Sequence, residues 1–97
     1  MILELIIAAI FFGAVATIVY TVTLLTVSVL AGLVRDAFKK LHNDNKVDLT
    51  GRLQGFVNNL DISHVDLVLT RNGEKVGNLQ VNYSESAGIR NGMKLSY

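Results

Sequence analysis

The amino-acid sequence predicts a membrane protein with a single transmembrane α-helix that extends beyond the bilayer and is followed by a small α+β module. Three observations predict this fold class: a long uncharged apolar run, an apolar stripe with helical spacing, and alternating apolar segments around a turn signal. The chain of 97 residues then divides into a transmembrane helix (1–34), a juxtamembrane helix end and turn (35–47) and a small interaction module (48–97). The module is expected to contain a short amphipathic helix and an antiparallel sheet of two to three strands.

The transmembrane helix is predicted from residues 5–34, which contain no charged side chain. As a helix this run would be about 45 Å long, whereas the hydrocarbon core of a bilayer is about 30 Å thick. Apolar residues continue the helical spacing beyond the run: Leu33, Val34, Ala37, Phe38 and Leu41. Because Asn43-Asp44-Asn45 then favours a turn, we expect the helix to cross the bilayer and to continue to about Leu41.

Basic residues follow the apolar run and predict how the chain is oriented. Arg35, Lys39 and Lys40 are expected at the membrane interface, where their side chains can reach the lipid headgroups. Because basic residues concentrate on the cytoplasmic side, the N-terminus is expected outside and the C-terminal module in the cytoplasm. Residues 47–97 contain five basic and five acidic side chains, so a nucleic-acid partner is not expected.

One side of the predicted transmembrane helix gathers small and hydroxyl-bearing side chains. These residues form the expected helix-packing face: Ala9, Gly13, Thr17, Thr21, Ser28 and Gly32. Small residues let two helices approach closely, and hydroxyl groups can form hydrogen bonds between helices. We therefore expect contacts with membrane lipid and with other transmembrane helices, in a homo-oligomer or a membrane complex. The alternative is that such residues are simply common in membrane helices and bond to their own backbone.

The module is expected to begin with a short helix over residues 48–60. An apolar stripe with helical spacing predicts it: Leu49, Leu53, Phe56, Val57 and Leu60. Asp48 is well placed to cap the first turn of this helix. Gly51 and Gly55 weaken it, and they either mark a close approach of the backbone or are ordinary glycines of a weak helix.

The rest of the module is predicted to be β-structure. Residues 65–69 and 79–83 alternate apolar and polar side chains, and Arg71-Asn72-Gly73 between them is typical of a hairpin turn. A three-residue loop with Gly73 in the left-handed conformation would set Val65 opposite Leu79 and keep the apolar residues on one face. Alternation from Met93 to Tyr97 predicts a third strand.

The sequence shows no pattern typical of an active site. It contains no cysteine, which excludes disulfides, thiolate metal sites and cysteine nucleophiles. His64 and Asp66 lie two residues apart on one face of a predicted strand, an arrangement that suits an orienting pair in a membrane enzyme or sensor. Since no nucleophile or third ligand lies nearby in the sequence, an exposed pair is favoured. We therefore expect no catalytic, cofactor-binding or metal site.

These observations together favour a non-enzymatic function based on assembly. The chain is expected to be a structural or accessory subunit of a membrane assembly, self-associating or packing through its transmembrane helix. The C-terminal module would dock a partner. Both a subunit of a cellular membrane complex and a protein of a membrane-containing virion fit this description.

The first residues allow an alternative interpretation. Ile2-Leu3-Glu4-Leu5-Ile6-Ile7 resembles the start of a mature type IV pilin, and the order of a long helix followed by β-structure is similar to that family. The resemblance implies a filament subunit with its N-terminal helix in the filament core and Glu4 paired with a neighbouring N-terminus. The two interpretations differ in topology, because a pilin-like chain would place its C-terminal domain outside.

Overall fold

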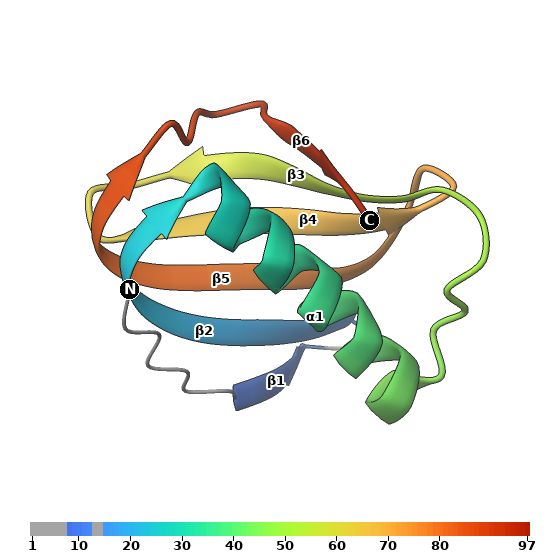
Figure 1. The fold of residues 1–97 in the computed structure, drawn as a ribbon. Coiled ribbons are helices and arrows are strands. Elements are labelled where there is room, and N and C mark those ends of the chain that lie inside the picture. Colours follow the sequence, from blue (N-terminus) through green and yellow to red (C-terminus); the bar gives the residue numbers. More distant parts are fainter. Residues whose placement is uncertain (1–7, 13–14) are drawn as a thin grey trace.

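The computed structural model describes residues 8–12 and 15–97, with side chains described from residue 16 onward; these residues form a six-stranded β-sheet with one helix across one face (Figure 1). The elements in chain order are β1 (Ala8–Phe12), β2 (Val15–Thr26), α1 (Val27–Asn45), β3 (Leu53–Leu60), β4 (His64–Arg71), β5 (Glu74–Ala87) and β6 (Lys94–Ser96). The order of strands in the sheet is β1-β2-β5-β4-β3-β6. β2 runs parallel to β5, and the other neighbouring strands are antiparallel.

The prediction of a membrane protein with a transmembrane helix is wrong. The apolar run supplies β1, β2 and the beginning of α1. Within the described residues, no helix is both long enough and apolar enough to span a bilayer. The single-pass topology, with its N-terminus outside and its C-terminal module in the cytoplasm, is therefore not supported.

The composition of β2 explains why this run folds as a strand. Most of its residues are the β-branched Val, Ile and Thr, which favour strands over helices. Ile18, Tyr20 and Val22 are buried, and the residues between them are more exposed, as the two-residue period of a strand requires. β2 lies between β1 and β5, and strands inside a sheet often read as continuous apolar runs. The long N-terminal helix implied by the pilin resemblance is thus absent from residues 15–26, and Ile2–Ile7 lie outside the described residues.

The helix that forms, α1, begins at Val27, in the last part of the apolar run that ends at Val34. Thr26 caps its N-terminus by accepting a hydrogen bond from the backbone N–H of Val29 (3.2 Å). The apolar stripe predicted by helical spacing is buried against the sheet: Leu33, Val34, Ala37, Phe38 and Leu41. The helix ends at Asn45, and Lys46 follows in the left-handed conformation (φ 61°). Residues 43–45, predicted as the turn that ends the helix near Leu41, belong to α1, which continues to Asn45; its stripe packs on a sheet instead of following a bilayer.

The second predicted helix, over residues 48–60, is also wrong. These residues contain β3, in which Leu53, Gly55 and Val57 are buried in alternation. A spacing of four residues fits one turn of a helix and also two periods of a strand, so the apolar stripe could not distinguish a helix from a strand here. A Cβ at Gly55 would lie 3.2 Å from Val34 Cγ2, so of the two alternatives for this glycine the close approach is the one that occurs, between strand and helix.

Asp48 does not cap a helix. Its carboxylate accepts hydrogen bonds from the backbone N–H (3.0 Å) and the hydroxyl (2.9 Å) of Thr50, and Arg71 Nη2 lies 3.3 Å away. The hydrogen bond from the backbone N–H of Thr50 contributes most, and with the hydrogen bond from the hydroxyl it holds the pKa of Asp48 below its usual range. The residue therefore fixes the loop that leads from α1 into β3.

The predicted hairpin around Asn72-Gly73 is confirmed, because β4 and β5 pair antiparallel on either side of it. The predicted three-residue loop is wrong: Arg71 pairs with Glu74, and both Asn72 (φ 53°) and Gly73 (φ 84°) have positive φ. A register shift after Leu69 keeps the apolar residues on one face, so that Val65 lies opposite Val81 instead of Leu79. The predicted C-terminal strand forms as β6, which pairs with β3.

Candidate functional site

The face of the sheet opposite α1 carries polar side chains, because each strand alternates between the core and this face. We call it the polar face. Its polar side chains are those of Thr17 and Thr21 of β2, Gln54 and Asn58 of β3, His64 and Asp66 of β4, and Asn78, Gln80 and Asn82 of β5, and the apolar side chains of Val19, Phe56 and Val68 lie among them. Of these residues only Asn58 is exposed, and the others are half-buried.

Strand pairing arranges these side chains in rows that cross the sheet. Asn78 pairs with Thr17, and Asn82 pairs with both Thr21 and His64. Gln80 pairs with Asp66. The parallel pairing of β2 with β5 therefore brings hydroxyl groups from the apolar run next to carboxamides from the C-terminal region.

A shallow depression of about 330 Å³ lies in the middle of the polar face. Its polar lining comes from four strands: Thr17, Asn58, Asp66, Asn78 and Gln80. Leu67 and Leu79 complete the lining. Both leucines have side chains buried on the other side of the sheet, so the surface offered to a ligand is mainly polar.

Hydrogen bonds between neighbours orient several of these groups. Gln80 Nε2 donates to Asn82 Oδ1 (3.2 Å). Asp66 Oδ2 accepts from Asn59 Nδ2 (3.3 Å) and lies 3.6 Å from His64 Nε2. One carboxylate oxygen of Asp66 is thus held between an amide and an imidazole beside the depression.

The structure brings His64 and Asp66 together, as their spacing predicted, but it surrounds them with carboxamides and threonine hydroxyls. Among the described residues, no group of three or more His, Cys, Asp or Glu side chains is placed to hold a metal ion. The chemistry available at the depression is therefore hydrogen bonding, with a single carboxylate.

The residues of the predicted helix-packing face are separated by the fold. Thr17 and Thr21 lie on the polar face, whereas Ser28 and Gly32 are exposed on α1. Ala9 belongs to β1, and Gly13 lies outside the described residues. The five described residues of this set share no face of one helix, since Ala9, Thr17 and Thr21 belong to strands.

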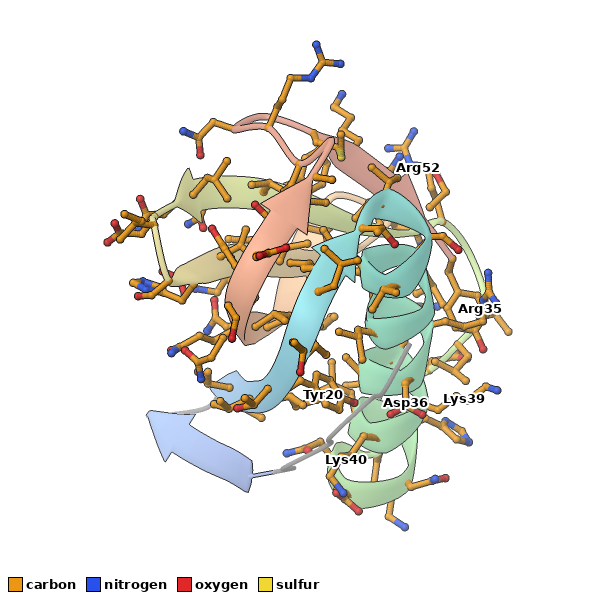
Figure 2. All side chains as sticks on the ribbon, turned by 60° about the vertical axis from the view of Figure 1, so that its left-hand side comes forward. Tyr20, Arg35, Asp36, Lys39, Lys40 and Arg52 are labelled. Carbon is orange, nitrogen blue, oxygen red and sulfur yellow. The ribbon has the colours of Figure 1, made fainter. Side chains whose placement is uncertain are left out.

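The basic residues predicted at the membrane interface lie on α1. Arg35 and Lys39 are exposed and point away from the sheet (Figure 2). Lys40 lies 3.4 Å from Asp44, one helical turn further along. Such exposed pairs contribute little to stability, so we assign these residues to the solvated side of α1.

Asp36, next to Arg35, has a partner that the sequence did not reveal. The hydroxyl of Tyr20, a side chain with no exposed surface, donates a hydrogen bond to Asp36 Oδ2 (2.7 Å) and so joins β2 to α1 (Figure 2). Burial, together with the hydrogen bond and the negative charge of Asp36, raises the pKa of Tyr20 above its usual range. The pair has a structural role, because the phenol lies in the core.

Sequence reasoning missed the polar face as a site. The alternation of Asn78, Gln80 and Asn82 was visible, but Thr17 and Thr21 were assigned to a helix. Comparison with models of known families, with curated proteins and with solved structures finds no match to this chain.

Proposed function

We propose that this chain is a non-enzymatic binding module that holds a neutral polyhydroxylated ligand, of the size of one or two sugar rings, on its polar face. The observation that carries this proposal is the depression of about 330 Å³ lined by polar side chains from four strands. Small-molecule sites have volumes of roughly 300–1,000 Å³, so this depression suits a ligand at the small end of that range.

The chemistry of the lining favours a neutral and hydrophilic ligand. Carboxamides such as Asn78 and Gln80 offer donors and acceptors together, and the hydroxyl of Thr17 does the same. Sugar hydroxyls need both kinds of partner. Asp66 is the one ionisable side chain among the described residues of the lining, and its charge disfavours anionic ligands.

The same lining supports binding in preference to catalysis. A hydrolytic site needs a nucleophile or a second carboxylate at a suitable distance from the first. Asp66 is accompanied by His64 and by amides, and the described part of the depression contains no second carboxylate. We therefore assign Asp66 to ligand hydrogen bonding, with His64 and Asn59 holding its orientation.

The proposal is tested by titrating the isotope-labelled intact chain with neutral mono- and disaccharides and recording its amide NMR spectrum. We expect saturable shifts at residues of β4 and β5 that border the depression. Asn78→Ala should weaken the binding by about two- to tenfold, since one uncharged hydrogen bond contributes roughly 0.5–1.5 kcal/mol. Asn43→Ala, which removes an exposed amide from α1, is the matched control and should leave the affinity unchanged.

Three outcomes would contradict the proposal. The first is the absence of any shift with the whole panel of neutral sugars. The second is a set of shifts confined to α1, and the third is an equal loss of affinity in Asn78→Ala and Asn43→Ala. Tighter binding of a uronic acid than of the corresponding neutral sugar would also contradict the role given to Asp66.

A further inference from the structure

The two edges of the sheet differ in how well they are protected against pairing with another strand. β6 is only three residues long and begins with Lys94, and short, charged edges resist pairing. β1 is five residues long, and its sequence Ala-Ala-Ile-Phe-Phe contains no charge and no proline. It thus lacks the charge and the proline by which proteins often protect an edge strand.

β1 is paired on one side by β2, from Ala8 opposite Val19 to Phe12 opposite Val15. Within residues 8–12 and 15–97, no strand pairs with its other side. The backbone N–H and C=O groups on that side need partners, and an added β-strand satisfies them with the same ladder that joins β1 to β2.

A second copy of this chain is the partner that fits this edge. Two copies of one strand can pair antiparallel about a twofold axis, and the same backbone N–H and C=O groups of each copy then bond to those of the other. No charged side chain occurs from Leu5 to Val34, so two such edges meet without repulsion. Because β1 has no charged side chain, it cannot select a charged partner through ion pairs.

We propose that β1 is the contact through which two copies of this chain form a dimer with one continuous sheet. An antiparallel pair of this kind has its twofold axis normal to the sheet, so both polar faces lie on the same side of the dimer. The inference goes beyond the proposed ligand site, because it uses the edge of the sheet and requires no ligand.

The test is the mass of the intact chain, measured by sedimentation equilibrium over a range of concentrations. The unmodified chain should have the mass of a dimer. Ile10→Lys should halve that mass, because the twofold axis places the two new charges close to one another in the centre of the strand. Ile62→Lys is the matched control: it replaces a large apolar side chain that is 89 % exposed, and the variant should remain a dimer.

A second variant keeps the proposal testable if Ile10→Lys does not fold. The chain has no cysteine, so Ile10→Cys introduces a single thiol, which should form a disulfide with its own copy under mild oxidation. The thiols are oxidised to the disulfide, and the added oxidant, oxidised glutathione, is reduced to two thiols. Asn91→Cys, in the exposed loop before β6, should remain unlinked.

The proposal is overturned if the unmodified chain is a monomer at every concentration. It is also overturned if Ile10→Lys and Ile62→Lys dissociate the assembly equally, or if Asn91→Cys crosslinks as fast as Ile10→Cys. None of these results depends on sugar binding, so failure of the dimer and failure of the ligand site are distinguishable.

Discussion

The two faces of the sheet are supplied by the same strands but differ in what they contact. On β5, Leu79 and Val81 are buried beneath α1, whereas Asn78 and Gln80 face the other way and are half-buried. The covered face is closely fitted to the helix, and the polar face offers hydrogen-bonding groups around a depression. Under the proposed function, stability resides on one side of the sheet and recognition on the other. Substitutions on the two faces should then have separable effects.

The largest loss of stability is expected for Phe38→Ala on α1. Phe38 has no exposed surface, and its ring packs edge-on against Tyr97 with a centroid distance of 5.8 Å. Removing a buried phenylalanine costs about 3–5 kcal/mol, because apolar contacts are lost and a cavity remains. Urea unfolding followed by circular dichroism measures this loss. Lys39→Ala, next to it but exposed, should change the free energy of unfolding by less than about 0.5 kcal/mol.

An intermediate loss is expected for Gly77→Ala, which tests how closely the covered face fits the helix. A Cβ at Gly77 would lie 2.8 Å from Leu41 Cδ1 and 3.2 Å from its Cδ2. Overpacking of this kind costs about 1–3 kcal/mol.

The substitution should cost much less in a Leu41→Ala background, because the clashing methyl groups are gone, and a double-mutant cycle measures that difference. Gly32→Ala is the opposite control: nothing lies within 4 Å of its added Cβ on the exposed side of α1. It should stabilise the chain by up to about 1 kcal/mol. Additive costs at Gly77 and Leu41 would contradict the close fit.

A smaller loss, with a characteristic pH dependence, is expected for Tyr20→Phe. Loss of the hydrogen bond to Asp36 should cost about 1 kcal/mol at neutral pH. The folded state raises the pKa of Tyr20 above its unfolded value of about 10, so the protonated phenol contributes stability that is fully present below that pH. This contribution is lost as the pH rises through the folded pKa.

Urea midpoints measured from neutral pH to above pH 10 should therefore fall more steeply in the unmodified chain than in Tyr20→Phe. Tyr97→Phe is the control, since Tyr97 is exposed and should keep the steep fall. Identical pH profiles for the unmodified chain and Tyr20→Phe would show that the phenol is not held in its protonated form by the fold.

The parts of the fold that depend on local signals were predictable from the sequence. The stripe of α1 and the turn at Asn72-Gly73 were found, because spacing and turn chemistry act over a few residues, whereas α1 ends at Asn45, beyond the predicted end near Leu41. β2 was not predicted, although its many β-branched residues favour a strand, because the long uncharged apolar run that contains it also fits a membrane helix. Its identity depends on pairing with β5, which begins at Ala16 opposite Gly77, and the sequence does not reveal so distant a partner.

The candidate site was predictable to a smaller extent. The face shared by His64 and Asp66 followed from their spacing, and the alternation of amides on β5 was visible. The contribution of Thr17 to the site could not be predicted, since it requires the parallel pairing of β2 with β5. A site assembled from four strands is fixed by the topology of the sheet, which local patterns do not specify.

The smallest effect on stability is expected for Gln80→Ala, and Leu79→Ala beside it provides the sharpest comparison of the two faces. Leu79 is 1 % exposed in the core, so its truncation should cost about 2–5 kcal/mol. Gln80 is half-buried on the polar face and donates one hydrogen bond, to Asn82, which water can replace. Its truncation should change the free energy of unfolding by less than about 0.5 kcal/mol while weakening sugar binding. A loss at Gln80 comparable with that at Leu79 in urea unfolding would mean that the polar face is a packed surface of the fold and not a site left open for a ligand.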